Sequence, residues 1–374
     1  MSELTTQQLP LDSTTESAPE NTSARSLFFK AVLITLGFLS FFILITSIVA
    51  GWFAWQQWQA FSNTSGVSFS ELKQTIEAGW DHPIAETDGY KNVLLLGVDS
   101  LETRVSAPAL TDTMIIVSLN LNSGVIKTLP LPRDIWSQEY QTKINALLVY
   151  GQERDPEDPT AFPTQVIDEI TAVDLHQTVI ISLDSLGQLI DTVGGIEVDV
   201  QQGFTDPQFP NPDVDVTTET DSEKLYQPIS FEAGPQLMDG QRALSFIRSR
   251  YSPGEEGTDL ARSKRQQQVI TALANKITDL ATLTNPTISG KLYRFYLDNF
   301  EDQIQLTEVV AMTRKLWPHR HDLRFDGNSL TVSDQDQVGV LEHPPVRPNQ
   351  YQGQWVYLIP DLAAFQEEVR QLLF

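Results

Sequence analysis

The segment NVLLLGVD, residues 92–99, carries the clearest strand signal in the chain. It is a continuous apolar run that ends on a carboxylate, and such runs are typical of strands buried on both faces. TMIIVSLN at 113–120 and VIKTLPL at 125–131 have a similar strand-like character. Residues 122–124 between them include Asn and Gly, so we predict that a hairpin turn joins these two strands. The globular part of the chain is thus expected to start with three neighbouring strands.

Patterns typical of helices and strands alternate through the rest of the chain. Helices are expected at residues 145–153, 163–173, 185–192, 236–250, 262–280, 306–317 and at the C-terminus. Further strands are expected at residues 176–184, 194–200 and 354–360. A long surface loop is expected at 201–230, which is rich in Pro, Asp and Thr, and a loop is expected at 281–290. This alternation predicts the α/β class, with a central mixed β-sheet flanked by helices.

An apolar stretch near the N-terminus, residues 27–55, predicts a transmembrane signal anchor. It is long enough to cross a hydrocarbon layer of about 30 Å. A cleaved signal peptide fits less well because the run ends in large Trp residues, and a buried core helix fits less well because the run is apolar on all faces. Residues 1–26 are expected to be a disordered cytoplasmic tail. Residues 56–89 are expected to be a juxtamembrane linker with a short helix near 69–78.

Residues at the two ends of the apolar stretch predict its orientation. Arg25 and Lys30 flank its first end, while Trp52, Trp55 and Trp58 lie at its far end. Basic residues favour the cytoplasmic side, and Trp side chains favour the membrane interface. We therefore expect a single-pass protein with a cytoplasmic N-terminus and an extracytoplasmic domain.

The charge balance and the absence of cysteine exclude several classes of function. The chain carries 49 acidic and 25 basic residues, for a formal net charge of −24. A surface this acidic repels the nucleic-acid backbone, so no nucleic-acid partner is expected. Without cysteine there is no disulfide framework, no thiolate chemistry and no cysteine-based zinc site. A site for an anionic ligand would need a local cluster of basic residues.

Two carboxylates accompany the first two predicted strands. Asp99 ends the first strand, and Asp112 directly precedes the second. Ligands in α/β sheets bind beyond strand ends, and Mg²⁺ needs few protein carboxylates. The two residues could therefore share one Mg²⁺ ion. The alternative is that both simply form turns.

The basic residues gather in one part of the sequence. Six of the 25 fall within 24 residues, namely Arg242, Arg248, Arg250, Arg262, Lys264 and Arg265. Arg262, Arg265 and Gln266 have a spacing that puts them on one helix face. A salt-bridged surface is one interpretation. Next to a carboxylate pair, however, arginines predict a pyrophosphate site, and on a membrane-anchored domain the natural ligand is a polyprenyl-pyrophosphate lipid.

Seven motifs together resemble a known family. They are NVLLLGVDS, TDTMIIVSLN, LPRDIW, KINALLVYG, VGGIEVDV, LMDGQRALSFIRSR and DLARSKRQQQVI. Their order is similar to that of the LytR-CpsA-Psr (LCP) family, over residues 90–282. Residues 283–374 would then be a C-terminal extension or a small subdomain.

The resemblance implies a fold and an activity. The fold is an LCP-like α/β core with an apolar pocket for a polyprenyl chain. The activity is Mg²⁺-dependent phosphotransfer at the bacterial cell membrane. It attaches a polyprenyl-pyrophosphate-linked anionic glycopolymer, such as teichoic acid or capsule, to peptidoglycan.

The resemblance also implies roles for particular residues. Asp99 and Asp112 would hold Mg²⁺. The pyrophosphate would be bound by Arg133, Lys143, Arg248, Arg250, Arg262 and Gln266, with Arg265 from the basic cluster as a further candidate. The residues expected to take part in catalysis are Arg133, Asp134, Arg250 and Asp259. The general base is left open between Asp134 and Asp259.

The sequence departs from the family pattern at three positions. Leu101 and Leu110 stand where members often have Arg, and Arg104 between them is a candidate replacement. Ala261 stands in DLAR where DLGR is common. These changes bear on the strength of one phosphate contact, not on the fold.

Two other functions remain open at this stage. The same site could release the pyrophosphate to water, as a polyprenyl-pyrophosphate hydrolase does. The domain could instead be a non-catalytic lipid-binding regulator of the cell envelope, similar to an attenuator. An acidic domain beyond a membrane is badly placed to contact DNA, so direct transcriptional control is disfavoured.

Overall fold

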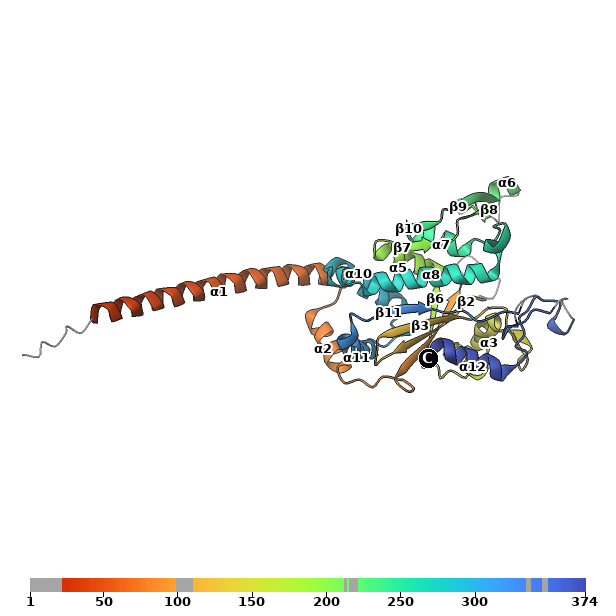
Figure 1. Ribbon diagram of the computed structural model, residues 1–374, viewed down its shortest axis with the longest axis horizontal. Helices are drawn as coiled ribbons and strands as arrows, with labels where there is room; N and C mark the ends of the chain where they lie inside the picture. Colours follow the sequence, from red (N-terminus) through yellow and green to blue (C-terminus); the bar gives the residue numbers. More distant parts are fainter. Residues whose placement is uncertain (1–21, 99–109, 212–213, 215–220, 334–337, 345–348) are drawn as a thin grey trace, which may run out of the picture. The chain divides into compact units, whose positions relative to one another are not determined.

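The computed structural model describes residues 22–98, 110–211, 214, 221–333, 338–344 and 349–374 (Figure 1). The chain divides into two units, Met1–Trp58 and Gln59–Phe374, and each is considered by itself. The expected tail at residues 1–26 lies almost wholly outside the described residues. Asp99, Leu101 and Arg104 also lie outside them.

The expected apolar anchor is helical. Helix α1 (Thr22–Ser65) is 44 residues long, and its segment Phe38–Ser65 is long and apolar enough to cross a membrane. The helix continues about ten residues beyond the predicted end of the anchor, so the first part of the expected linker is helical. It ends at Gly66, whose φ of +75° terminates a helix at low cost.

The linker also contains the predicted short helix, α2 (Phe69–Gly79). Ser68 caps its first turn, because its side chain accepts from the backbone N–H of Glu71 while the Glu71 carboxylate accepts from the N–H of Ser68. The capping pair explains why the helix begins there.

A mixed five-stranded sheet forms the centre of unit Gln59–Phe374, as expected. Its order is β11-β3-β2-β1-β6. The strands are β1 (Tyr90–Val98), β2 (Thr111–Asn120), β3 (Val125–Pro130), β6 (Gln177–Ser182) and β11 (Arg324–Gly327). β2 is antiparallel to β1 and β3, whereas β6 and β11 run parallel to their neighbours. The predicted turn at 122–124 is confirmed, with Asn120 Oδ1 accepting from the N–H groups of Asn122 and Ser123.

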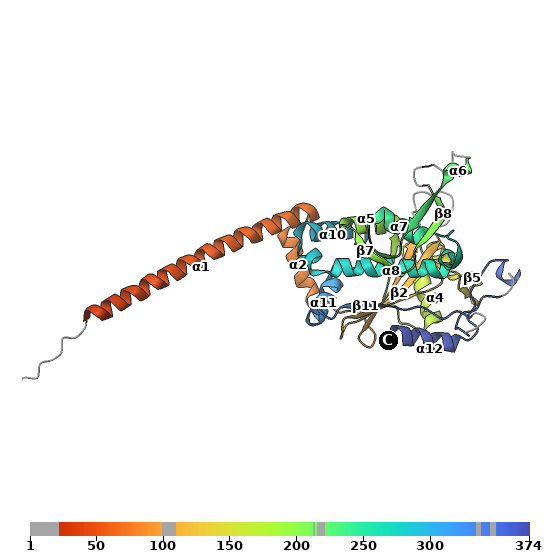
Figure 2. The same cartoon turned by 45° about the horizontal axis from the view of Figure 1, so that its top comes forward.

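Helices cover both faces of this sheet (Figures 1 and 2). One core lies under α3 (Leu147–Arg154), α4 (Ala161–Thr171) and α12 (Leu362–Leu373). A second core lies among α5 (Leu183–Thr192), α7 (Gly240–Arg248), α8 (Asp259–Thr278) and the strand pair β7 (Ile196–Val200) and β10 (Gly234–Met238). Both views show α8 and α12 on opposite sides of the sheet.

Further helices and small strand pairs complete this unit. The helices are α6 (Ser222–Leu225), α9 (Leu280–Thr284), α10 (Pro286–Asn299) and α11 (Leu306–Leu316). Short 3₁₀ helices are Ile144–Ala146, Gly254–Gly257, Trp317–His319 and Asn349–Tyr351. Two small antiparallel pairs are β4 (Trp136–Ser137) with β5 (Thr142–Lys143), and β8 (Phe204–Pro210) with β9 (Tyr226–Phe231).

Four sequence predictions are wrong. The expected loop at 201–230 contains the β8–β9 hairpin, because Phe204, Phe209 and Phe231 point inward and bury their rings. The expected helix at 236–250 begins only at Gly240, where the Asp239 side chain caps it, and β10 precedes it. The remaining two errors lie nearer the C-terminus.

The expected loop at 281–290 is largely helical. Asn285 separates α9 from α10 and caps the latter, whose first residue is Pro286. The expected strand at 354–360 contains only two isolated bridges, formed by Tyr357 and Leu358.

Residues 283–374 extend the core of the same unit. β11 pairs with β3, and the α12 side chains of Phe365, Val369 and Leu373 are fully buried in the core that also holds residues of β1, β2 and β3. The last residue, Phe374, packs edge-on against Tyr90 at the start of β1. The sheet therefore needs its C-terminal elements to be complete.

We expect Phe365→Ala to lower the free energy of unfolding of residues 59–374 by about 3–5 kcal/mol, because it leaves a cavity in this core. Leu362→Ala is the matched control on the same helix, since its side chain is 49% exposed and should cost no more than about 0.5 kcal/mol. Urea denaturation followed by circular dichroism measures both. Equal effects, or a separate transition for the C-terminal residues, would contradict a shared core.

Candidate functional site

A cluster of paired charges lies at the edge of the central sheet where β2 begins. Asp112 is the second residue of β2, and its carboxylate is partly buried. Its Oδ1 accepts from Nη1 of Arg133, in the segment after β3. Its Oδ2 accepts from Nη2 of Arg250 at 3.1 Å, in the segment between α7 and α8. One carboxylate thus joins two guanidiniums from distant parts of the chain.

These arginines control the ionisation of Asp112. Burial alone would raise the pKa of this carboxyl, but the positive charges of Arg133, Arg250 and Arg262 together outweigh burial. The pKa of Asp112 is therefore held below its ordinary value. The group remains a carboxylate throughout the physiological pH range.

Arg133 also takes part in a second series of ion pairs. Its Nε lies 3.5 Å from Oδ2 of Asp134, whose Oδ1 accepts from Lys143 Nζ at 2.6 Å. Asp134 is buried, and Lys143 lies in the small β5 strand that pairs with β4. The predicted residues Arg133, Asp134 and Lys143 are therefore close together.

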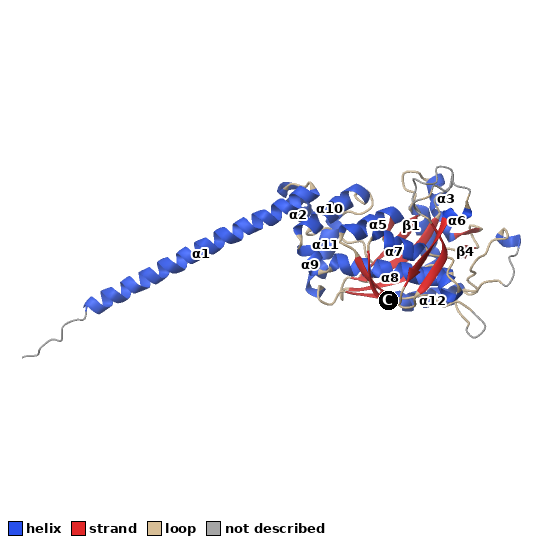
Figure 3. Cartoon of the chain, turned by 90° about the horizontal axis from the view of Figure 1, so that it is seen from above, coloured by secondary structure: helices blue, strands red, loops and turns tan. Residues whose placement is uncertain are grey.

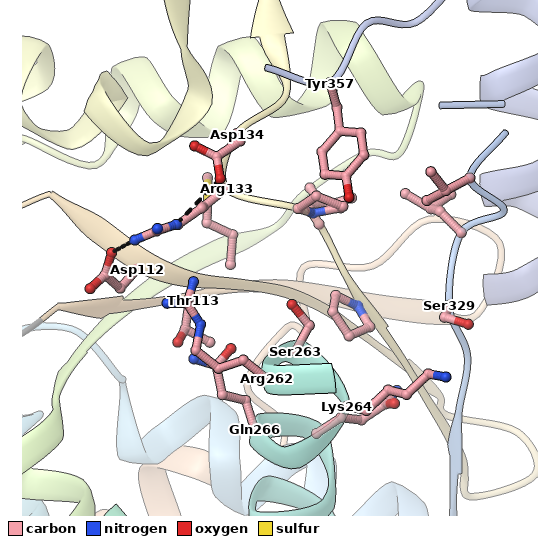
Figure 4. Close-up of a pocket in the computed structure, with 17 residues that line it drawn as sticks. Asp112, Thr113, Arg133, Asp134, Arg262, Ser263, Lys264, Gln266, Ser329 and Tyr357 are labelled. Carbon is pink, nitrogen blue, oxygen red and sulfur yellow. Dashed lines mark hydrogen bonds and ion pairs between the residues drawn. The ribbon is translucent and has the colours of Figure 1, made fainter. Parts of the chain in front are cut away.

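A pocket lies beside these residues (Figure 4). It is a narrow cavity of about 30 Å³ that is partly open to solvent. Its polar lining consists of Asp112, Thr113, Arg133, Asp134, Arg262, Ser263, Lys264, Gln266, Gln267, Ser329 and Tyr357. Its apolar lining consists of Met114, Pro130, Leu131, Pro132, Leu330 and Val332. A lining that combines cationic and apolar side chains suits an amphiphilic ligand with a negative charge.

The first turns of α8 provide the cationic wall opposite Tyr357 (Figure 4). Arg262 and Gln266, one turn apart, both line the pocket, and both are buried. The Thr258 side chain caps this helix by accepting from the N–H of Ala261. The helix N-terminus carries partial positive charge, which adds to that of Arg262 and Lys264.

Arg265, in contrast, does not line this pocket. Its guanidinium is buried and donates to the carbonyl oxygens of Phe246, Ser249 and Glu256 and to the Glu256 carboxylate. It therefore fixes the segment between α7 and α8, which carries Arg250. Burial lowers the pKa of Arg265 but leaves the group charged.

Asp206 in β8 supports the same segment and was not predicted from the sequence. Its buried Oδ2 accepts from the backbone N–H groups of Arg250, at 2.9 Å, and Tyr251, at 3.2 Å. The only available signal was an acidic residue in a stretch whose composition suggested a loop. Tyr357 was also missed, since it reaches the pocket through backbone hydrogen bonds with Asp134 and Trp136.

The other residues predicted for the site lie outside the pocket lining or have side chains that the structure does not describe. Arg248 ends α7 and is not among the pocket-lining residues. Asp259 is the first residue of α8, but its side chain lies outside the described part of the structure. Leu110 is exposed beside β2.

The described residues supply one carboxylate suited to a metal ion at this site. Each Asp112 oxygen has lone pairs beyond the one that accepts from an arginine. Mg²⁺ takes one or two carboxylates and fills its shell with water and phosphate oxygens. Asp112 therefore fits a Mg²⁺ that binds together with a phosphate ligand. Among the residues that the structure describes, no group of three His, Asp or Glu could hold a metal without such a ligand.

Comparison with known proteins gives a consistent picture. The model of the LytR_cpsA_psr family matches residues 59–342. The polyisoprenyl-teichoic acid–peptidoglycan teichoic acid transferase TagU of Oceanobacillus iheyensis is 29% identical over 65% of this chain and 68% of its own length. The enzyme of the same description, TagV of Bacillus subtilis, is 25% identical over 65% of this chain and 57% of its own length.

A solved structure agrees in fold. The crystal structure of Bacillus subtilis TagV matches with a TM-score of 0.51 and 20% sequence identity, over 77% of this chain and 98% of that chain. The mixed sheet with its flanking helices is therefore shared with TagV.

The lowered pKa of Asp112 predicts a pH-dependent contribution to stability. A carboxylate with a depressed folded-state pKa stabilises the fold above its unfolded pKa of about 3.9, and this is lost as the pH falls through the folded value. The difference in unfolding free energy between the wild type and Asp112→Asn should thus be largest at neutral pH and shrink below about pH 4. Urea denaturation across this range measures the difference. A difference independent of pH would contradict the ion pairs.

Proposed function

This chain belongs to the LytR-CpsA-Psr family, and we propose that it transfers an anionic glycopolymer from a polyprenyl-pyrophosphate carrier to peptidoglycan. The names of TagU and TagV, which describe teichoic acid transferases acting on peptidoglycan, support this assignment. The polymer belongs to the class of teichoic acid, capsule or a similar glycan.

The observation that carries the proposal is the pairing of Asp112 with both Arg133 and Arg250 beside the pocket. The described cluster holds the cations Arg133, Lys143, Arg250, Arg262 and Lys264 against the carboxylates of Asp112 and Asp134. Local positive charge therefore exceeds negative charge in a chain whose net charge is −24. Such an excess attracts a doubly phosphorylated ligand.

The arginines would stabilise the charge that develops during transfer. An acceptor hydroxyl oxygen attacks the phosphorus on the sugar side of the pyrophosphate and forms a new P–O bond. The bond between this phosphorus and the bridging oxygen breaks, and polyprenyl phosphate leaves with the electron pair. Arg133, Arg250 and Arg262 would neutralise the leaving group and the transferred phosphoryl oxygens.

A carboxylate would receive the proton of the acceptor hydroxyl. Both oxygens of Asp112 accept from arginines, whereas, among the described residues, Oδ2 of Asp134 has a long contact of 3.5 Å with Arg133 Nε. We therefore propose Asp134 as the general base, with Asp259 as the second candidate.

We also propose Mg²⁺ as the cofactor. Asp112, together with Asp99, would hold the ion, which would supply Lewis-acid stabilisation of the phosphate charge when bound. In the same proposal α1 spans the membrane with the N-terminus in the cytoplasm, so that Gln59–Phe374 lies on the outer side.

Arg133→Ala and Arg250→Ala should each lower glycan transfer by about 10²–10³-fold, because each removes charge stabilisation from the transition state. The assay uses the full chain in membranes with a polyprenyl-pyrophosphate-linked sugar, a peptidoglycan oligomer and Mg²⁺. Arg294→Ala is the matched control, since Arg294 lies on α10 away from the pocket lining and, among the described residues, forms an ion pair only with Asp298. Near-normal transfer by both site variants would overturn the phosphate contacts, and release of sugar phosphate into water by the wild type would identify a hydrolase.

Asp134→Asn should lower the rate of transfer by about 10²–10⁴-fold while leaving donor binding nearly unchanged, because it removes a proton acceptor without removing a cation. Single-turnover rates and donor binding are measured on the same preparation. A loss of binding with an unchanged rate would instead assign Asp134 to positioning Lys143 and Arg133.

A further inference from the structure

An exposed apolar surface runs along α2 and onto the end of α11. On α2 and directly after it, Phe69, Ile76 and Trp80 are 65%, 40% and 52% exposed. Trp317, directly after α11, is 60% exposed. We call these four residues, together with Arg314 and Arg320, the α2–α11 face.

The three α2 positions form one stripe because they are separated by seven and four residues. The neighbouring side of the same helix is the packed one. A Cβ at Gly79 would lie only 2.6 Å from the Val310 Cβ on α11, so the two helices approach closely there. The apolar stripe therefore lies outside the helix contact, where solvent would meet it.

Arginines accompany both tryptophans of this face. The Arg314 guanidinium carbon lies 5.6 Å from the centre of the Trp80 ring, and that of Arg320 lies 5.0 Å from Trp317. Trp combined with a long basic side chain is typical of the membrane interface, where the ring meets acyl chains and the cation meets phosphate. Arg314 also pairs with Asp81 at 3.1 Å, so Arg320 contributes most to reducing the repulsion of this acidic chain from anionic lipids.

The last residues of α1 connect this face to the apolar helix. Ser65 and Val67 are buried in unit Gln59–Phe374, and Phe61 packs against Tyr293 of α10. Phe69 follows Ser65 by four residues, so the two are at most about 14 Å apart along an extended chain. Figures 1 and 3 place α2, α10 and α11 together at one end of this unit.

We propose that the α2–α11 face contacts the lipid bilayer into which α1 inserts. The argument rests on the apolar helix α1, whose last turn at Ser65 lies four residues before the stripe begins, and on the Trp–Arg pairs. A second copy of the chain or another protein would leave both features unexplained. The proposal does not depend on the transferase reaction.

The test uses the full chain, which lacks cysteine and so accepts a single cysteine label. Ile76→Cys and Trp317→Cys place an environment-sensitive dye on the face. Leu237→Cys on β10 is the control, since this apolar side chain is also exposed, at 75%. Each protein is reconstituted into phosphatidylcholine–phosphatidylglycerol vesicles that carry nitroxide-labelled lipid as a quencher.

We expect dyes at both face positions to be quenched about twofold more strongly than the control dye, because an interfacial helix buries its apolar side about 5–10 Å deep. Circular dichroism confirms that each labelled chain is folded. Equal quenching at all three positions would overturn the proposal. An Ile76→Cys dye that is not quenched, in a chain that crosslinks to a second copy through this cysteine, would also overturn the proposal and assign the face to a dimer. A dye that is shielded only when another protein is added would overturn it as well and assign the face to that protein.

Discussion

The carboxylate of Asp112 organises the region in which the chemistry is proposed. Arg133 and Arg250 are far apart in the sequence, and their like charges repel each other. A shared carboxylate offsets this repulsion and keeps both guanidiniums beside the pocket. A guanidinium carries five N–H donors, so an arginine that binds Asp112 can also donate to a phosphate ligand. The supports behind Arg250, namely Asp206 and Arg265, act on the same arrangement through the backbone.

Much of the central sheet could be predicted because its strands are defined by local pattern. β1, β2 and β3 are apolar runs, and their turn has Asn and Gly where the backbone requires them. The β8–β9 hairpin could not be found in the same way. Pro and Asp interrupt its strands, and their inward-facing phenylalanines pack against Phe246 of α7. Tertiary packing determines that contact, and the local sequence pattern of the strands does not predict it.

The site residues that lie within single sequence motifs could be predicted. The partner that each side chain contacts was harder to predict, because it depends on which groups the folded chain brings nearby. Arg262 and Arg265 lie three residues apart on one helix, yet one lines the pocket and the other ties down a distant segment. Spacing fixes a helix face only approximately, and the available carbonyl and carboxylate acceptors decide the rest. Tyr357 enters from more than 200 residues beyond Arg133, through a pairing that only the folded chain creates.

The parallel pairing of β11 with β3 affects the order in which the molecule can fold. Arg324 pairs with Val125, and α12 then covers the core under β1 and β2. Contacts between such distant segments form slowly, because a large loop must close before they contribute. The central strands are synthesised early, so part of their apolar surface stays exposed until α12 has been synthesised and packs on the core. During this interval chaperone binding and aggregation compete with completion of the domain.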